Sequence, residues 1–389
     1  MNSDVKRRKG GSRTKGNPSK VNLPLEGVKI LDASRVLAGP FCSMLLSDLG
    51  AEVIKVEDRE KGDETRYYQP LIGRESSYYL SINRNKKVLF LNLKERNGRE
   101  RLYSLMRKSD VFIHNFLPRV EEELGVGYDT IRSKNGKIIY VTISGYGREG
   151  ERASLPGYDI LMQGESGLMS VTGTDENNLA RIGNSTVDIY TAYLCATTIL
   201  AYLYSSAKRG ERGATRVDIP LIGSAIYSMP FLFGYLAATG ENPKPAGTAH
   251  PGIVPYQPFD TKDRKLIIAV ANNNQWGRFC SAVNRPDLVN DERFRTNELR
   301  VKYRDELIPL LEQIMIQKRA SQWIRIFNGR LIPVAPINRL TDVMNEMSLS
   351  SFIERRNVRG KEMLFTKFPA SIDGKRIRSF RRNPPTHRK

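Results

Sequence analysis

The stretch "GVKILDASRVLAGPFCSMLLSDLGAEVIKVE" (27–57) decides the fold of this chain. Its first part, "GVKILDAS" (27–34), is short and rich in β-forming residues, which is typical of a buried strand. "AGPFCSMLLSDLG" (38–50) has apolar residues at helical spacing and ends on Gly50, a common helix C-terminus. "AEVIKVE" (51–57) reads as a second strand. A strand, a helix and a strand in this order predict a parallel pair joined by a right-handed crossover.

The same alternation continues downstream. Four more strands are predicted, with a helix between the first two: "KKVLFLNL" (86–93), the helix "NGRERLYSLMRKS" (97–109), "DVFIHNF" (110–116), "KIIYVTISGYG" (137–147) and "ATRVDIPL" (214–221). We therefore expect an α/β fold over 22–222, a doubly wound, mostly parallel sheet with helices on both faces. The first strand-to-helix turn is "SRVLAGP", without the G-x-G-x-x-G of dinucleotide-binding proteins. The chain also lacks a phosphate-binding P-loop and a G-x-S-x-G nucleophile elbow.

The rest of the chain predicts a smaller α+β domain. A helix is expected over 222–240, before the Pro/Gly-rich connector "TGENPKPAGTAHPG" (239–252). The segments after it are a strand and helix at 265–283, helices at 300–315 and 321–329, and an extended stretch at 332–340. The expected organisation is a disordered basic tail (1–21), a large domain (22–222), a linker helix and connector (223–246), a small domain (247–339) and a return segment to the large domain with a basic C-terminal tail (340–389).

Positive charge is concentrated at the two ends of the chain, whose formal net charge is +20. Residues 1–21 contain seven Lys/Arg and one acid, and residues 354–389 contain twelve Lys/Arg and three acids. Such tails can contact nucleic acid, an acidic partner or another polyanionic surface, or they can be solvated ends that favour solubility. Because the middle of the chain has no nucleic-acid-binding signature, nucleic acid is expected at most as a tail contact.

The sequence gives no sign of a membrane segment, a metal site or a disulfide framework. The longest apolar stretches, 192–204 and 229–238, are shorter than the roughly 20 residues that span a bilayer, so both predict buried helices. The N-terminus has no hydrophobic signal-peptide core. Cys42, Cys195 and Cys280 are odd in number and irregularly spaced, and only three histidines are present. We expect no metal and a reducing compartment: the cytoplasm, or alternatively the mitochondrial matrix.

Asp188 is the one carboxylate in "GNSTVDIYTAYLCATTILAYLYSS" (183–206), and its local sequence allows two interpretations. Ser185 and Asp188 match the [ST]-x-x-[DE] capping box, in which both residues serve only to begin a helix. The same position also suits a carboxylate nucleophile, since the helix dipole and backbone N–H groups of a first turn favour the ionised form. Spacing alone does not separate these roles.

A series of ordered landmarks resembles the class III CoA-transferases (CaiB/BaiF), the family of formyl-CoA transferase and carnitine CoA-transferase. The resemblance covers about residues 22–345. It is carried by "LPLEGVKILDASRVLAGPFCSMLLSDLGAEVIKVE" (23–57), "GDETR" (62–66), "NRNKKVLFLNLK" (83–94), "DVFIHNF" (110–116), "ISGYG" (143–147), "PGYDILMQGESGLMSVTG" (156–173), "GNSTVDIYTA" (183–192), "GTAHPGIVPYQPF" (247–259) and "NNNQW" (272–276).

The resemblance implies an enzyme that acts by covalent catalysis, and places the family's nucleophilic aspartate at Asp188. The carboxylate would attack an acyl-CoA thioester to give an acyl–aspartyl anhydride and then an aspartyl–CoA thioester, from which an incoming acid takes up the CoA. Backbone N–H groups would stabilise the oxyanions. Coenzyme A is implied as a co-substrate, with no permanently bound cofactor. The partners implied are an acyl-CoA, a free carboxylic acid and a second copy of the chain in an interlocked homodimer.

Matching positions also carry over the family's CoA contacts. Those implied here are Val36, Ala38, Arg59, Leu91–Lys94, Asn115, Phe116, Tyr158 and Asp159. Without the resemblance, Val36 and Leu91 could equally be core residues and Arg59 a solvated charge. The chain departs from the family at Leu37, where a polar residue is frequent, and at Leu117 and Glu123, where arginine is frequent; Arg119 could substitute there.

The α-methylacyl-CoA racemases share this fold and are the main alternative. Racemases need an acid/base group on each face of the substrate α-carbon, and theirs include the histidine of a "GHD" motif. Here the motif is Gly157-Tyr158-Asp159. Because a tyrosine with a pKa near 10 is a poor base at neutral pH, the substitution favours a transferase.

Within the transferases, "GTAHPGIVPYQPF" (247–259) and "TNELRVKYRDEL" (296–307) most resemble the succinyl-CoA:glutarate and related dicarboxylate enzymes. This resemblance implies that His250, Tyr256 and Gln257 lie near the acyl groups if the small domain closes over the site. His250 could instead be a loop histidine satisfied by backbone groups. The terminal "NPPTHRK" (383–389) stops where relatives extend into a final helix.

Overall fold

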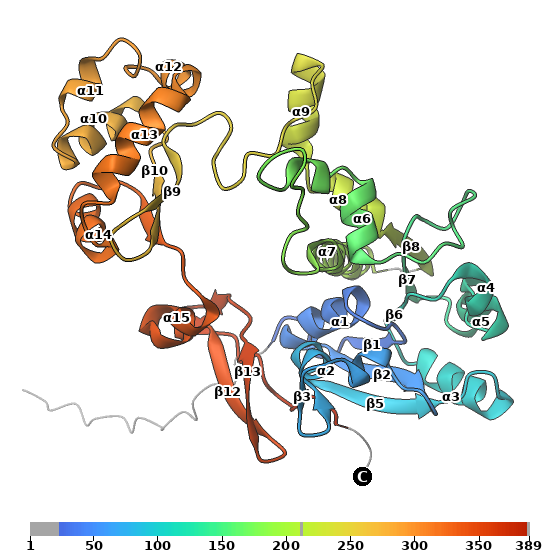
Figure 1. Cartoon of the computed structure of the whole chain (residues 1–389). Helices are drawn as coiled ribbons and strands as arrows, with labels where there is room; N and C mark the ends of the chain where they lie inside the picture. The colour runs from blue at the N-terminus through green and yellow to red at the C-terminus, as the bar shows by residue number, and fades with distance from the viewer. Residues whose placement is uncertain (1–22, 211–212, 387–389) are drawn as a thin grey trace, which may run out of the picture.

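The structure is a computed structural model that describes residues 23–210 and 213–386. The predicted basic tail at 1–21 lies outside the described residues. Figure 1 shows a large body built on a sheet and a smaller, mainly helical body, joined by the segments before β9 and after β11.

The large body is built on a parallel sheet of six strands in the order β5-β2-β1-β6-β7-β8. The strands are β1 (Lys29–Asp32), β2 (Glu52–Asp58), β5 (Lys86–Leu91), β6 (Val111–His114), β7 (Ile139–Ser144) and β8 (Thr215–Pro220). Because the order runs outward from β1 in both directions, the sheet has a switch point between β1 and β6. The predicted parallel α/β sheet is confirmed.

Helices cover both faces of this sheet. The helices of the large body are α1 (Ala38–Asp48), α2 (Ser77–Ile82), α3 (Arg96–Met106), α4 (Pro118–Glu123), α5 (Tyr128–Lys134), α6 (Asp159–Glu165), α7 (Thr186–Arg209), α8 (Leu221–Tyr227) and α9 (Pro230–Thr239). Alternate strand residues divide between two cores: Ile30 packs with α1 and α7, and Leu31 packs with α3 and α5. Two short hairpin strands, β3 (Leu71–Ile72) and β4 (Glu75–Ser76), precede α2.

Two apolar segments differ from the prediction. The helix expected over 222–240 is two helices, α8 and α9, bent by 64° at a break before Pro230. By length and composition α7 could cross a membrane, and so could the bent pair if counted as one span, whereas the sequence stretches were expected to be too short. In the fold, α7 lies against α1 and contributes Val187, Cys195 and Ile199 to a core.

The small body pairs a three-stranded antiparallel sheet with a group of helices and has its own core. Its elements are β9 (Tyr256–Asp260), β10 (Lys265–Ala269), α10 (Asn273–Ala282), α11 (Asp287–Asn290), α12 (Asn297–Lys302), α13 (Arg304–Met315), α14 (Ala320–Asn328) and β11 (Val334–Pro336). The helix predicted at 300–315 is interrupted at Tyr303, between α12 and α13.

The last part of the chain returns to the large body (Figure 1). It contains α15 (Leu340–Asn345), α16 (Met347–Ser350), the hairpin β12 (Ile353–Val358) and β13 (Lys361–Thr366), and the short strands β14 (Ser371–Ile372) and β15 (Lys375–Arg376). Phe365 and Phe380 pack with Leu80 of α2. The Asn85 side chain donates to the Ser379 carbonyl at 2.7 Å and accepts from the Arg381 N–H at 2.8 Å. Much of this basic segment is therefore folded onto the large body.

Candidate active site

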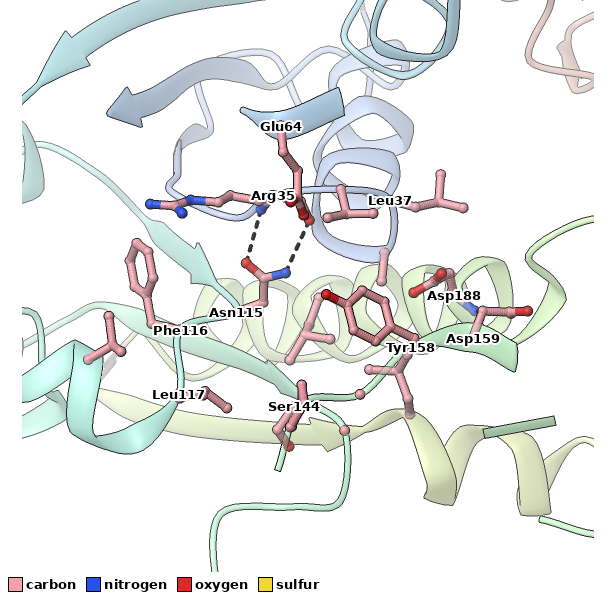
Figure 2. A pocket seen from close by; sticks show the side chains of 18 of the residues that line it. Arg35, Leu37, Glu64, Asn115, Phe116, Leu117, Ser144, Tyr158, Asp159 and Asp188 are labelled. Atoms are coloured by element: carbon pink, nitrogen blue, oxygen red, sulfur yellow. Dashed lines mark hydrogen bonds between the residues drawn. The ribbon is translucent and has the colours of Figure 1, made fainter. Parts of the chain in front are cut away.

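A cavity of about 290 Å³ opens at the carboxyl ends of β1, β6 and β7, where a parallel sheet of this order places its ligands (Figure 2). Asn115 and Phe116 lie on one side, and Tyr158, Asp159 and Asp188 lie on the other. The lining consists of residues 35–38, 115–118, 143–145 and 156–159, with Glu64, Val120, Asp188 and Leu221. Seven of the residues implied by the family resemblance, six CoA contacts and Asp188, thus meet in one cavity.

Asp188 is half-buried in the first turn of α7 and faces this cavity. Burial, together with the nearby carboxylate of Asp159, raises the pKa of Asp188 to about 7. The expectation that the helix start would hold this carboxylate firmly ionised is therefore wrong: removal from water and a like charge outweigh the helix dipole. At neutral pH the group lies close to the midpoint of its titration.

The cap of α7 comes from Asp159 and not from Ser185. Asp159 Oδ1 accepts the N–H of Val187 at 2.8 Å and that of Asp188 at 3.4 Å. Ser185 occupies the N-cap position, but its side chain makes no capping hydrogen bond. The capping box inferred from Ser185 and Asp188 is therefore wrong, because a carboxylate from α6 takes its place.

Asp159 is itself fixed by its surroundings. The Gln163 side-chain amide donates to Asp159 Oδ2 at 2.5 Å, and Gln163 Oε1 accepts the N–H of Ile182 at 2.8 Å. Behind them, Gly145 and Gly157 touch through their backbones, and a Cβ built on Gly157 would lie 2.3 Å from the Gly145 Cα. This close approach allows the segment that carries Tyr158 and Asp159 to reach the end of β7.

The turn after β1 forms the facing wall. Val36 has a φ of +67°, which is unusual for a β-branched residue. Asn115, at the end of β6, binds the backbone of this turn. Its Oδ1 accepts the Arg35 N–H at 2.9 Å and its Nδ2 donates to the Arg35 carbonyl at 3.1 Å (Figure 2). Part of the Asn115 side chain's hydrogen-bonding capacity is thus used within the protein to shape the wall.

A second cavity of about 340 Å³ adjoins the first, and the two share Arg35, Phe116 and Val120. It is lined by the other implied CoA contacts, Arg59 and Leu91–Lys94. Its lining mixes charges: Arg59, Lys61 and Lys94 lie on loops after β2 and β5, beside Glu57, Asp58 and Glu60. The two cavities form a path from this charged end to Asp188. The interpretation of Val36 and Leu91 as core residues is incomplete, because both also line this path.

The positions that depart from the family pattern have other roles here. Leu117 lines the first cavity as an apolar residue. Arg119 is paired with Glu123 at 2.8 Å on an exposed turn of α4, so its charge is already partly balanced. Neither Arg119 nor Glu123 lines the two cavities.

Sequence reasoning missed several residues of the site. Arg35 lies where the two cavities meet, and its guanidinium lies 5.5 Å from the centre of the Phe116 ring. Glu64, from the "GDETR" landmark, also lines the first cavity. Tyr78 lines neither cavity, although burial and the charge of Asp188 raise its pKa. Arg35 and Glu64 lie within the landmarks at 23–57 and 62–66, a signal that could have identified them.

His250, Tyr256 and Gln257 lie in the small body and line neither cavity. The His250 ring packs edge-to-face on Tyr256, and its Nδ1 accepts the N–H of Gly252 at 3.1 Å. The interpretation of His250 as a loop histidine with backbone partners therefore describes this chain. That His250, Tyr256 and Gln257 lie near the acyl groups when the small domain closes over the site stays a prediction.

Comparisons with known proteins agree with this geometry. The model of CoA-transferase family III matches residues 25–388. The chain is 40% identical over 324 residues to the mouse succinyl-CoA:glutarate CoA-transferase, covering 83% of this chain and 74% of the relative. It is 33% identical over 329 residues to the Agrobacterium fabrum succinate–glutarate CoA-transferase, covering 82% and 81%. A crystal structure of a CaiB/BaiF family protein from Brucella suis superposes with a TM-score of 0.83 at 30% identity, covering 94% and 97%. The chain therefore belongs to CoA-transferase family III, and is an enzyme that transfers CoA between acyl groups.

Proposed function

We propose that this enzyme transfers CoA from succinyl-CoA to a second dicarboxylic acid, with Asp188 as the nucleophile. The observation that carries the proposal is the position of Asp188: it lies in the first turn of α7, at the end of the two-cavity path, and its carboxyl group has a pKa of about 7. The names of the relatives, which transfer CoA between succinate and glutarate, support the choice of dicarboxylates.

In the proposed reaction, a carboxylate oxygen of Asp188 attacks the thioester carbonyl carbon and expels CoA thiolate, leaving an acyl–aspartyl anhydride. The thiolate attacks the aspartyl carbonyl carbon and expels the donor acid as a carboxylate, which leaves aspartyl–CoA thioester. The acceptor carboxylate then attacks this thioester, forming a new anhydride and thiolate. Attack of the thiolate on the acceptor's acyl carbon releases the new acyl-CoA and restores Asp188. No step needs a net proton, redox partner or metal.

The path of the two cavities supports a placement for CoA. The phosphates of CoA would lie near Arg59 and Lys94, whose charges suit phosphate oxygens. The pantetheine chain would pass Arg35 and Phe116 and follow Val36 and Ala38 toward Asp188. Tyr158 and Asp159 would then flank the thioester.

We also propose that the enzyme is a homodimer. Among the described residues, none in α9 is buried, and Phe231, Phe233 and Tyr235 are 72%, 45% and 47% exposed. Tyr193 and Tyr204 of α7 and Tyr227 of α8 are exposed as well. An apolar surface of this kind is typical of a covered interface. Closure of a small domain over the site would bring His250, Tyr256 and Gln257 to the acyl groups.

The test is mass spectrometry of the enzyme incubated with succinyl-CoA. We expect a covalent adduct on the peptide that contains Asp188, lost in Asp188→Ala and retained in Ser185→Ala, a matched change in the same turn that leaves the nucleophile in place. Full CoA exchange by Asp188→Ala would refute the proposal. Deuterium uptake at the α-carbon of a 2-methylacyl-CoA without any acceptor acid would instead indicate a racemase.

A further inference from the structure

Two landmarks of the sequence, "GDETR" (62–66) and "NRNKK" (83–87), supply charged residues that are buried rather than exposed to substrate. Asp63 pairs with Lys55 of β2, with 2.9 Å between Oδ2 and Nζ, and Lys86 pairs with Asp32 of β1 at 3.2 Å. All four side chains have no exposed surface. Both pairs contact the turn that follows β1 and forms a wall of the first cavity: Lys55 donates to the Ser34 carbonyl, and Asp32 Oδ1 accepts the Ser34 N–H.

The Lys55–Asp63 pair holds the turn from below. Lys55 Nζ donates to the Ser34 carbonyl at 2.8 Å, so it bridges Asp63 and the turn. Asp63 Oδ1 accepts a long hydrogen bond, 3.5 Å, from the Val36 N–H. Asp63 is fixed in turn by Thr65, whose N–H and Oγ1 donate to the same oxygen at 3.0 and 2.7 Å.

Burial of these charges costs free energy, so fold stability alone does not explain the ion pair. A buried ion pair gives up the hydration of both groups, and apolar residues of similar size often stabilise a fold as well or better. Burial alone would raise the pKa of Asp63, but Lys55 and Thr65 hold that pKa below its ordinary value, so the pair stays charged. Because Asp63 stays ionised, it holds the Lys55 ammonium in place beside the Ser34 carbonyl.

The turn held by this pair is strained. Val36 adopts a left-handed conformation that L-residues with branched side chains disfavour, and such conformations persist only where the surroundings enforce them. Here the enforcement comes from two directions: Asn115 from the end of β6, and Lys55 with Asp63 from below. The strained segment is the one that presents residues 35–38 to the cavity at Asp188.

We propose that Asp63 and Lys55 are positioning residues for CoA transfer: their buried ion pair holds the turn at 34–36 in the conformation that aligns acyl-CoA with Asp188. They act through the backbone and line no part of the first cavity themselves. The inference rests on acyl-CoA occupying this cavity. It assigns a role in the reaction to "GDETR", a motif that otherwise contributes only Glu64 to the cavity.

The test compares Asp63→Asn with Asp48→Asn. Asp48 is also a fully buried carboxylate, paired with Arg84 at 2.5 Å, but it lies at the far end of α1 from the turn.

For both variants we would measure the melting temperature, the Kd for CoA by calorimetry, kcat and KM for acyl-CoA, and amide hydrogen exchange at 34–38. We expect both melting temperatures to fall. Only Asp63→Asn should speed amide exchange at 34–38. It should also weaken CoA binding and lower kcat/KM, each by about tenfold or more, because the wall of the binding cavity is misplaced.

A double-mutant cycle with Val36→Gly tests whether the effect passes through the strained residue. Glycine adopts positive φ without strain, so Asp63→Asn should cost less than about threefold in kcat/KM in the glycine background. If Asp63→Asn does not fold, Thr65→Val, which removes one hydrogen bond to Asp63, replaces it in the same cycle. Equal CoA affinity and exchange at 34–38 in the Asp63 and Asp48 variants, or strict additivity with Val36→Gly, would overturn the proposal. Because CoA affinity and exchange do not depend on the Asp188 chemistry, failure of the proposed nucleophile would be seen separately.

Discussion

Asp159 Oδ1 accepts the backbone N–H of Val187 at 2.8 Å, so a carboxylate of α6 caps the helix whose first turn carries Asp188. Burial of Asp188 is the larger cause of its raised pKa of about 7, and the charge of the Asp159 carboxylate is the second cause. Capping stabilises α7, whereas the like charge destabilises the ionised nucleophile. Asp159 thus helps to fix the position of Asp188 and adds to the effect of burial in raising the pH at which Asp188 becomes reactive.

The two roles of Asp159 are separable by substitution. Asp159→Asn keeps a side-chain oxygen that can accept the Val187 N–H but removes the charge, so it should move the acidic limb of the kcat/KM profile to lower pH with little loss of stability. Asp159→Ala should cause the same shift and also lower the free energy of unfolding by about 1 kcal/mol, the usual cost of a lost cap. Thermal unfolding and pH-dependent kinetics of both variants check this. An Asn variant with an unshifted profile would contradict the electrostatic role.

The wild-type enzyme should lose activity as pH falls through about 7. Only ionised Asp188 attacks the thioester, so kcat/KM should fall about tenfold per pH unit below the pKa of the free enzyme and be flat above it. Initial rates between pH 5 and 9, in buffers of constant ionic strength, measure this limb. A limb with its midpoint near 4 would mean that Asp188 titrates as an ordinary, solvated carboxylate.

Asp188→Asn should be more stable than the wild type at pH 8, but not at pH 4. The pKa of Asp188 is about 7 in the folded chain against an ordinary value of 3.8, so its stabilising contribution is complete below about pH 4 and is lost as pH rises through 7. Asparagine does not titrate, and the gap at pH 8 should be on the order of a few kcal/mol. Urea unfolding at the two pH values measures it, with Ser185→Ala as the control that keeps the titrating group. A constant gap would refute the linkage.

Arg59→Gln and Lys94→Gln should raise KM for acyl-CoA with kcat nearly unchanged. Their charges lie at the end of the path remote from Asp188, so they contribute binding energy that is equal in the ground and transition states. We expect roughly a fivefold increase for each, decreasing at high salt because exposed charges are screened. Arg278→Gln, which neutralises an exposed arginine of the small body, is the matched control. A fall in kcat with unchanged KM would place these cations elsewhere in the reaction.

The sequence predicted the sheet well because each strand of a parallel α/β layer is locally apolar and is followed by a helix of clear periodicity. It did not predict the cap of α7, since the Asp159 carboxylate lies 28 residues before the Val187 N–H that it accepts. For the same reason, burial and a like charge from α6 overrode the local rule that a first-turn acid is held ionised. Helix breaks at Tyr303 and before Pro230 were also missed, because the apolar pattern continues across both. The cap of α7 and the raised pKa of Asp188 both depend on contacts between segments that are distant in sequence, which local patterns do not show.

Phe231→Glu should weaken self-association of the enzyme. Phe231 is 72% exposed on α9, where none of the helix's residues is buried, and a charge placed in an apolar interface between two copies would be desolvated without a partner. We expect the dissociation constant of the Phe231→Glu dimer to be about tenfold or more above that of the wild type. Ile316→Glu, at a 50% exposed apolar residue of the small body, is the control and should leave the association unchanged. Sedimentation velocity over a concentration series measures both. If the wild type sediments as a monomer at every concentration, or Phe231→Glu associates as tightly as the wild type, the exposed faces of α7, α8 and α9 do not form the proposed interface.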